Sequence, residues 1–185
     1  DAFVMRDPSG IRPAFYHADD EIIVVCSEAP LIQTVFGVKE ELVKPLPPGH
    51  ALTIKRSGAW QIEQILQPLA LTQCSFERIY FSRGNDAGVY REREQLGRLL
   101  LAPLMRMLER GNLSLKQAVL TFIPNTSELA FLGLAKEAQD HLDGLKTAAF
   151  KALANRPAGG SAEDDRSLQE LLSAKVRTEK VVHKD

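Results

Sequence analysis

Three polar residues stand where an apolar segment gives way to a predicted helix. Asn125, Thr126 and Ser127 follow Gln117–Ile123, which we predict to be a strand. Backbone N–H groups and hydroxyls at a helix N-terminus can bind an anion or a hydrated metal ion. Asn125 can equally cap the helix, with Glu128 three residues later completing a capping-box-like arrangement. Spacing alone favours the cap, and the anion or metal site is the second interpretation.

The two cysteines, Cys26 and Cys74, are the other candidates for chemistry. They are too few for a disulfide-stapled secreted scaffold, so we expect reduced thiols in a cytoplasmic protein. The sequence contains no Cys-x-x-Cys, His-Glu-x-x-His, Walker or Gly-x-Ser-x-Gly motif. The histidines are scattered, which predicts surface or structural positions for all four: His17, His50, His141 and His183.

The composition of the chain gives no reason to expect nucleic acid or a membrane as a binding partner. The chain has 185 residues, of which 44% are hydrophobic and 25% charged, and its net charge is −1. Such a balance is ordinary for a globular protein and gives no overall positive field to attract nucleic acid or anionic lipid. The longest apolar segments are too short to span a bilayer. We therefore expect no nucleic-acid partner and no membrane partner.

The first third of the chain predicts β-structure. Asp7-Pro8-Ser9-Gly10 has the residues of a tight turn, and Ser57-Gly58 predicts a hairpin turn. Ala29–Phe36 predicts a short helix that Gly37 ends. Alternating strands and turns favour a layered sheet over a helix bundle. The predicted strands are Ala2–Met5, Arg12–Tyr16, Glu21–Cys26, Leu42–Val43, Ala51–Ile54 and Trp60–Leu66.

From Val89 onwards the pattern becomes helical. Apolar residues recur at helical spacing to Leu108, and Pro103 should kink or split this helix. A second apolar stripe predicts a long helix from about Glu128 to Leu153. The remaining predictions are a strand or extended connector at Phe76–Phe81, a mobile loop at 155–166, a helix at Ser167–Lys175 and an edge strand at Val176–His183. Taken together, these elements predict a two-part α/β protein.

Six segments of the chain carry recognisable sequence motifs. They are Arg6–Pro13, Val25–Glu28, Leu46–Ala51, Cys74–Arg83, Val89-Tyr90 with Arg93 and Gly97, and Ile123–Ser127. In this order they resemble the patterns RDPxGIRPL, VASES, VxPGE, CxFEYIYFARPDS, VYxxRxxxG and the first strand and loop of a phosphoribosyltransferase domain. Together they cover residues 2 to about 135 and resemble the glutamine phosphoribosylpyrophosphate amidotransferases.

The resemblance implies a fold and a reaction in two halves. It implies that 1–72 is the C-terminal part of an N-terminal-nucleophile glutaminase sandwich and that 73–88 connects it to the next domain. It implies that 89–185 starts a Rossmann-like phosphoribosyltransferase domain, with an insertion around 136–175. An N-terminal Cys releases ammonia from glutamine, and ammonia displaces pyrophosphate from phosphoribosylpyrophosphate. The product is phosphoribosylamine, in the committed step of purine synthesis.

The resemblance also assigns roles to individual residues. Ser127 matches the position that contacts catalytic Mg²⁺, and Thr126 is a candidate phosphate contact. Cys74 matches a ligand of a four-iron–four-sulfur cluster, which needs four thiolates. Cys26 matches no cluster position, so we expect Cys74 to be unligated in this chain. Arg12, Glu28, Glu77 and Arg93 are expected to form structural pairs rather than to contact substrate.

The resemblance leaves the isolated chain without a complete site. The nucleophilic Cys is expected upstream of Asp1, and the phosphoribosylpyrophosphate loop is expected downstream of Asp185. We therefore predict that the chain alone has neither activity, and that the parent protein is a homo-oligomer acting on glutamine and phosphoribosylpyrophosphate. One alternative is a non-catalytic scaffold with this fold. Another is a hexosamine-forming amidotransferase, against which the Pro124–Ser127 segment argues.

Overall fold

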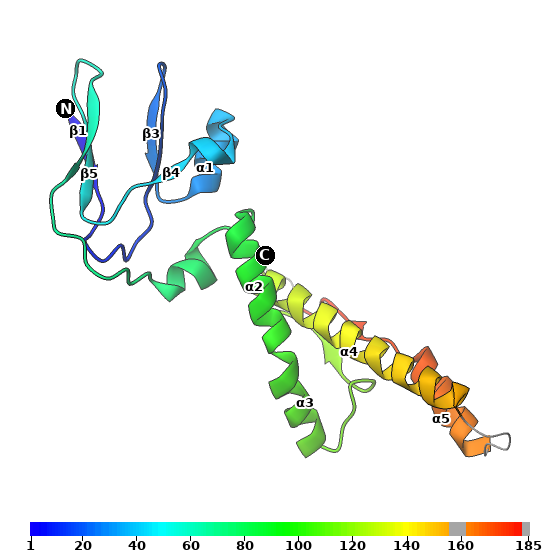
Figure 1. Ribbon diagram of the computed structural model, residues 1–185. Helices are drawn as coiled ribbons and strands as arrows, with labels where there is room; N and C mark the ends of the chain where they lie inside the picture. The colour runs from blue at the N-terminus through cyan, green and yellow to red at the C-terminus, as the bar shows by residue number, and fades with distance from the viewer. Residues whose placement is uncertain (156–161, 183–185) are drawn as a thin grey trace. The chain divides into compact units, whose positions relative to one another are not determined.

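The computed structural model describes residues 1–155 and 162–182 and has a mixed α/β fold (Figure 1). The chain divides into two compact units, Asp1–Val89 and Tyr90–Asp185. Each unit is described separately below. Among the described residues, no helix combines the length and apolar character needed to cross a membrane.

The first unit contains two antiparallel sheets of three strands each. In one sheet Met5 pairs with Ala51, and Leu52 pairs with Ile62. In the other, Phe15 pairs with Cys26 on one side and with Pro45 on the other. The first sheet has the order β1 (Ala2–Met5), β5 (His50–Ile54), β6 (Trp60–Gln64), and the second has the order β3 (Ile23–Cys26), β2 (Phe15–Ala18), β4 (Lys44–Pro45).

The predicted β-structure of this unit is confirmed, with two corrections. The second strand lies at Phe15–Ala18 rather than Arg12–Tyr16, because the chain bends at Arg12 and strand pairing begins only at Phe15. Leu42–Val43 is not a strand. Leu42 ends the 3₁₀ helix η1 (Glu40–Leu42), where the N–H of Val43 donates to the carbonyl of Glu40 at 3.1 Å.

The turn at Asp7–Gly10 forms as the sequence predicts. The carboxylate of Asp7 accepts hydrogen bonds from the N–H groups of Ser9 at 3.0 Å and Ile11 at 2.9 Å. Gly10 has φ +59°, a conformation that glycine adopts without strain. Buried Arg6 donates to the carbonyl oxygens of Arg12, Leu46 and Gly10 at 2.8–3.2 Å. One guanidinium thereby ties the turn to the segment before β5.

Helix α1 (Ala29–Phe36) also forms as predicted, with Gly37 in the left-handed region at φ 66°. Phe76–Phe81 instead differs from the predicted strand or extended connector. Glu77–Phe81 forms the π-helix η2, in which the N–H of Ser82 donates to the carbonyl of Glu77 at 2.8 Å. The rings of Phe76, Tyr80 and Phe81 contact one another with centroids 5.3–5.9 Å apart. Aromatic residues favour strands because their side chains pack against those of a neighbouring strand. Here the rings pack on each other instead.

The second unit combines helices with one pair of parallel strands. Val119 pairs with Arg177 and Leu120 with Thr178, and the chain between these strands forms two helices. The elements are α2 (Ala87–Leu99, which begins in the first unit), α3 (Leu101–Arg110), β7 (Val119–Leu120), α4 (Glu128–Ala154), α5 (Ala162–Ser173) and β8 (Arg177–Thr178).

The predicted split of the first helix is confirmed, but it lies at Leu100 rather than at Pro103. Pro103 is the third residue of α3, where a missing N–H removes no intrahelical hydrogen bond. Leu101 and Leu108 of α3 are buried, whereas Met107 is 68% exposed.

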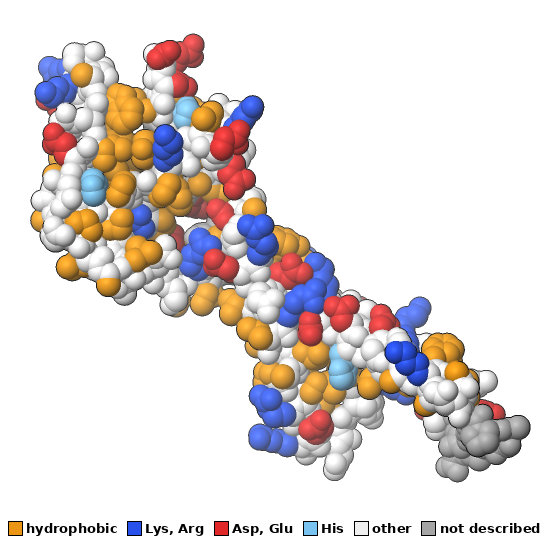
Figure 2. Space-filling model, in the orientation of Figure 1, with side chains coloured by type: hydrophobic (Ala, Val, Ile, Leu, Met, Phe, Trp, Pro, Cys, Tyr) orange, Lys and Arg blue, Asp and Glu red, His pale blue; other side chains and the backbone are white. Residues whose placement is uncertain are grey.

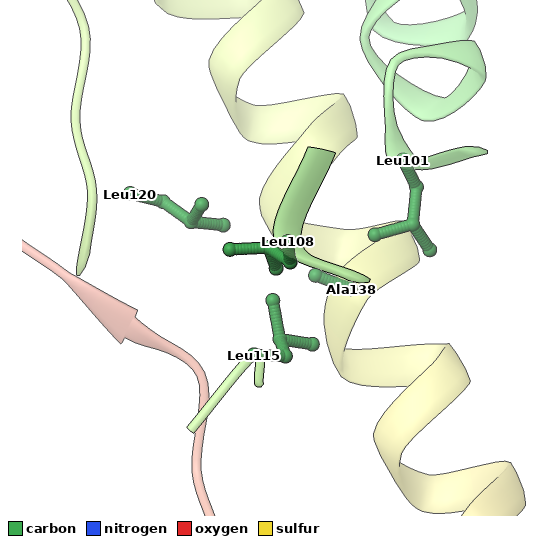
Figure 3. Packing of buried hydrophobic residues seen from close by; sticks show 5 residues of the cluster. All are labelled: Leu101, Leu108, Leu115, Leu120 and Ala138. Atoms are coloured by element: carbon green, nitrogen blue, oxygen red, sulfur yellow. The ribbon is translucent and has the colours of Figure 1, made fainter. Parts of the chain in front are cut away.

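The core of the second unit is small. Leu101 and Leu108 of α3 meet Ala138 of α4 (Figure 3). Leu115 and Leu120 complete this buried cluster, so the core joins α3, α4 and the residues around β7. Beyond Leu142 the apolar stripe of α4 is largely exposed, and large hydrophobic side chains are exposed in both units (Figure 2).

Three further predictions in this unit need correction. The strand predicted at Gln117–Ile123 pairs only at Val119–Leu120. Within the described residues 176–182, the strand predicted at Val176–His183 pairs only at Arg177–Thr178. The helix predicted at Ser167–Lys175 occupies Ala162–Ser173. Residues 162–166 of the predicted mobile loop are therefore helical, and 156–161 lie outside the described residues.

Candidate functional site

The segment between β7 and α4 carries the residues predicted to bind an anion or a metal ion. Pro124–Ser127 form the turn that leads into α4. The carbonyl of Asn125 accepts the N–H of Glu128 at 3.2 Å, and the carbonyl of Ser127 accepts the N–H of Phe131 at 2.9 Å. Thr126 is half-buried and Ser127 is exposed. The structure therefore places both predicted site residues at the N-terminus of a 27-residue helix.

The predicted capping box is wrong. Ser127, not Asn125, is the N-cap residue of α4, and no side chain caps the helix. The Ser127 hydroxyl instead donates to the carbonyl oxygen of Ile123. A hydroxyl that donates in this way still has lone pairs that can accept a hydrogen bond or coordinate a cation. The helix N-terminus itself favours negative charge, so the loop suits an anion accompanied by a cation.

Two glycines fix the position of this loop relative to α2. A side chain at Gly97 would overlap the carbonyl oxygen of Ala130, and one at Gly133 would overlap the carbonyl oxygen of Glu94. On each helix, the absence of a glycine side chain therefore lets the backbone of the other helix approach closely. Ala130 lies in the first turn of α4, so this contact holds the start of α4 against α2. The sequence near Gly133 does not reveal this contact, because the contact joins residues that are distant along the chain.

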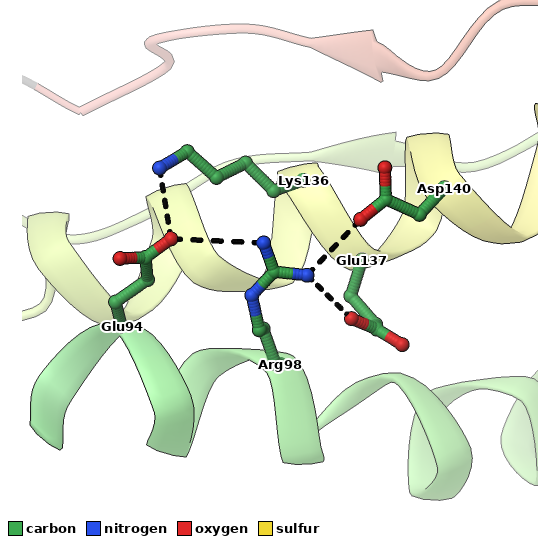
Figure 4. A network of polar contacts seen from close by, with 5 residues as sticks. All are labelled: Glu94, Arg98, Lys136, Glu137 and Asp140. Atoms are coloured by element: carbon green, nitrogen blue, oxygen red, sulfur yellow. Dashed lines mark hydrogen bonds and ion pairs between the residues drawn. The ribbon is translucent and has the colours of Figure 1, made fainter. Parts of the chain in front are cut away.

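A charged network joins the same two helices (Figure 4). Lys136 donates to Glu94 at 2.8 Å, and Arg98 donates to Glu137 at 2.7 Å and to Asp140 at 3.0 Å. The hydrogen bond from Lys136 lowers the pKa of Glu94, and the carboxylate of Glu94 raises the pKa of Lys136. Glu137, followed by Asp140, raises the pKa of Arg98. These groups stabilise each other's charged forms, which suits a structural clamp better than proton transfer.

Cys74, the third predicted site residue, lies in the first unit. Its N–H donates to the carbonyl of Ile11 at 3.0 Å, and its side chain is half-buried. Within the described part of the chain, no three His, Cys, Asp or Glu side chains form a group that could hold a metal ion. Cys74 lines a cavity of about 150 Å³ together with Glu77 and Arg83.

Arg12, Glu28 and Glu77, three of the residues expected to form structural pairs, do form them. Arg12 pairs with buried Glu77 at 3.0 Å and lies over the Phe81 ring at 5.2 Å from its centroid. Glu28 pairs with Arg83 at 3.7 Å and accepts the N–H of Arg83 at 3.2 Å. These pairs connect η2 and the segment after it to the rest of the first unit.

No protein-family model matches the chain. Three curated relatives are amidophosphoribosyltransferases. The one from Archaeoglobus fulgidus is 32% identical over 99 residues, which is 51% of this chain and 21% of the relative. The one from Pseudomonas aeruginosa is 28% identical over 137 residues, or 70% of this chain and 26% of the relative. The one from Pasteurella multocida is 32% identical over 103 residues, or 51% of this chain and 20% of the relative.

Two solved structures are similar over 73% of this chain. One is the glutamine phosphoribosylpyrophosphate amidotransferase of B. subtilis complexed with ADP and GMP, with a TM-score of 0.53 and 26% identity, covering 28% of that structure. The other is described as the allosteric regulatory enzyme of purine biosynthesis, with a TM-score of 0.56 and 29% identity, covering 27% of that structure. The chain spans about a fifth to a quarter of the length of its curated relatives. The resemblance predicted from the six motifs is confirmed.

Proposed function

We propose that this chain is part of an amidophosphoribosyltransferase that makes phosphoribosylamine from glutamine and phosphoribosylpyrophosphate. The observation that supports the proposal is the similarity to three curated amidophosphoribosyltransferases, to a solved glutamine phosphoribosylpyrophosphate amidotransferase and to a solved regulatory enzyme of purine biosynthesis. The family's fold then assigns 1–72 to a glutaminase sandwich, 73–88 to a connector, and 89–185 to the start of a Rossmann-like phosphoribosyltransferase domain. The helical region 136–175 is an insertion in this assignment.

The loop before α4 serves the phosphoribosyl half of this reaction. Pyrophosphate is an anionic leaving group, and the N-terminus of α4 offers backbone N–H groups to an anion. Bound Mg²⁺ supplies charge stabilisation for a departing pyrophosphate, and oxygen ligands suit it. The Ser127 hydroxyl is exposed and donates its proton to Ile123, so its lone pairs are available to the cation or to its water. Thr126 lies beside it as a phosphate contact.

Catalysis requires more residues than this chain supplies. The glutaminase half needs a thiol activated by its own α-amino group. Neither Cys26 nor Cys74 matches that position in the family's motifs. We therefore expect the 185-residue chain to be inactive and the full-length protein to be active. Ammonia release from glutamine by the purified chain, above that of a heat-inactivated sample, would contradict this.

The test of the phosphoribosyl assignment is Ser127→Ala in the full-length protein. Phosphoribosylamine synthesis should fall, and the Mg²⁺ concentration for half-maximal synthesis should rise, while glutamine hydrolysis is largely retained. Ser173→Ala is the matched control, because Ser173 is also exposed and also donates to a backbone carbonyl, that of Glu170 at 3.1 Å. Superimposable Mg²⁺ titrations for Ser127→Ala and wild type would assign the hydroxyl a structural role, with about 1 kcal/mol of stability lost.

The same assays separate the enzyme from the alternative of a non-catalytic scaffold. An enzyme hydrolyses glutamine and consumes phosphoribosylpyrophosphate in the full-length wild type. A scaffold does neither, whatever residue stands at position 127.

A further inference from the structure

His17 is a buried histidine whose two ring nitrogens both face hydrogen-bond acceptors. It lies in β2 and is 6% exposed. Its Nδ1 atom lies 3.2 Å from the carbonyl oxygen of Leu42, and its Nε2 atom lies 3.0 Å from a carboxylate oxygen of Asp19. A carbonyl oxygen and an ionised carboxylate can only accept hydrogen bonds. Both contacts are therefore hydrogen bonds only if both ring nitrogens carry a proton.

Asp19 stays an acceptor throughout the pH range in which a histidine titrates. The N–H groups of Ile22 and Glu21 each donate to its Oδ1 atom at 2.8 Å. These two hydrogen bonds, followed by the one from His17, lower the pKa of Asp19 from 3.8 to about 2. Histidine ordinarily changes charge between about pH 5 and 8. The carboxylate is therefore already negative when an imidazole gains its second proton.

Only the doubly protonated ring of His17 satisfies both of its neighbours. A neutral imidazole carries one N–H group, on either Nδ1 or Nε2. If Nδ1 holds the proton, the lone pair of Nε2 faces the carboxylate of Asp19. If Nε2 holds it, the lone pair of Nδ1 faces the carbonyl oxygen of Leu42. Either neutral form thus sets two acceptors against each other, whereas the charged ring is paired with Asp19, as a buried charge requires.

The two contacts join segments that strand pairing leaves unconnected. β2 pairs with β4 through Phe15 and Tyr16, so His17 lies one residue beyond this ladder. Its ring continues the connection by reaching Leu42, the last residue of η1. We propose that His17 and Asp19 form a pH-sensitive latch, which holds β2 to the end of η1 while the imidazole carries both protons and loses one of its two contacts when the ring becomes neutral.

Few other ionisable groups surround the latch. Helix α1 packs against β2 and carries no ionisable side chain. Among the described residues, the hydrogen bonds and the ion pair of His17 go to Leu42 and Asp19 alone. The ionisable groups on the remaining neighbours are Cys26 of β3, Lys44 of β4, Glu40 and Glu41 of η1, and Asp20 and Glu21 of the turn after β2.

The latch has a defined sign in its effect on stability. The folded contacts favour the protonated ring, so the latch stabilises the first unit at low pH, and this contribution is lost as pH rises and the ring loses its proton. Urea unfolding of the 185-residue chain at about pH 5.5 and about pH 8.5 brackets the ordinary titration of histidine. Trp60 fluorescence follows the unfolding, because its ring lies 6.2 Å from that of Tyr16, the residue next to His17. We expect a lower urea midpoint at the higher pH.

Asp19→Asn separates the latch from every other titrating group. The Oδ1 atom of asparagine can still accept the N–H groups of Ile22 and Glu21, and its side-chain N–H can donate to Nε2 of a neutral ring. Both contacts of His17 can then be made without a charge on the ring. We therefore expect this variant to lose most of the difference between the urea midpoints at the two pH values.

His50→Gln is the matched control. The Nδ1 atom of His50 lies 2.8 Å from the carbonyl oxygen of Pro48, a contact that a neutral ring can make. This variant should keep the pH difference of the wild type. A pH difference that Asp19→Asn retains in full, or that His50→Gln abolishes, would overturn the proposal.

A second measurement uses the wild-type chain and decides the question even if Asp19→Asn fails to fold. Nitrogen-15 NMR distinguishes a ring nitrogen that carries a proton from one that does not. At about pH 5.5 we expect protons on both Nδ1 and Nε2 of His17, each protected from exchange with water by its hydrogen bond. A ring nitrogen of His17 that lacks a proton at this pH would show that the latch does not form.

Discussion

The first unit is organised by main-chain hydrogen bonds, whereas the second is organised by contacts between helices. In Asp1–Val89, strand registers and tight turns fix the elements, and buried Arg6 satisfies three carbonyl oxygens. In Tyr90–Asp185, α2 and α4 meet at Gly97 and Gly133, and among the described residues a cluster of five buried side chains lies at the core. Stability in the first unit therefore depends on completing hydrogen bonds, and in the second on keeping two backbones close. The two units should respond to different kinds of mutation.

The largest effect is expected for Gly97→Ala. The new methyl group would overlap the carbonyl oxygen of Ala130, which is backbone and cannot move aside without shifting α4. We expect the free energy of unfolding of the second unit to fall by about 3 kcal/mol. Urea unfolding followed by far-ultraviolet circular dichroism measures it, because the long helices α2, α3 and α4 dominate that signal.

Gly144→Ala is the matched control for that substitution. Gly144 lies in α4, and a side chain there meets nothing within 4 Å. Alanine is the better helix former, so this variant should be more stable by about 0.5–1 kcal/mol. If Gly97→Ala gains stability as Gly144→Ala does, helix propensity and not the close crossing controls the second unit.

A smaller loss is expected for Arg6→Met in the first unit. The substitution leaves the buried carbonyl groups that Arg6 bonds without a donor, including that of Leu46 at 2.8 Å. We expect a loss of about 2 kcal/mol. The single tryptophan, Trp60, lies in β6 of this unit, so its fluorescence during urea unfolding reports the change. Arg56→Met, at an exposed arginine, is the control and should leave the transition unchanged. If Arg6→Met shifted only the circular dichroism signal of the helices, the separation of the two units would be contradicted.

Arg98→Met should have a weaker effect that depends on salt. Arg98 is held by Glu137 and Asp140, and its pKa is raised by them, so it is charged at every pH at which the protein folds. The ion pairs are partly open to solvent, and about 1 M salt reduces the screening length to roughly 3 Å. The difference in unfolding free energy between this variant and wild type should therefore shrink as salt is added. A difference that persists at high salt would mean that packing of the arginine stem matters more than its charge.

The smallest effect is expected at Asp19 as pH falls. Hydrogen bonds from the N–H groups of Ile22 and Glu21, and from His17, lower the pKa of Asp19 from 3.8 to about 2. A lowered pKa means that Asp19 stabilises the fold fully above its unfolded value and that this contribution disappears as pH falls towards 2. The amide signal of Ile22 should titrate near pH 2 by NMR. Asp19→Asn should abolish this titration, whereas Asp20→Asn, at the neighbouring exposed position, should not.

Local patterns predicted those parts of the fold that neighbouring residues control. The turn at Asp7–Gly10, the end of α1 at Gly37 and the strand β1 all form as predicted, because turn geometry and left-handed glycine depend on a few adjacent residues. The spacing of apolar residues likewise predicted the long helix α4. The positions of Thr126 and Ser127 at its N-terminus follow from that helix, although their roles in binding stay predictions.

The sequence by itself determined the mixed α/β character, the order of elements and the resemblance to amidophosphoribosyltransferases, since these depend on local residue types and their spacing. Only the tertiary structure decided which backbone groups meet. Gly97 lies against Ala130 and Gly133 against Glu94, and nothing local to either glycine reveals a partner so distant along the chain. The same holds for the aromatic segment of η2, which turns helical because its rings pack on each other, and for Glu77, whose burial beside a cavity requires distant segments to fold around it. Local preferences involve energies of about 1 kcal/mol or less per residue, and contacts between distant segments readily override them.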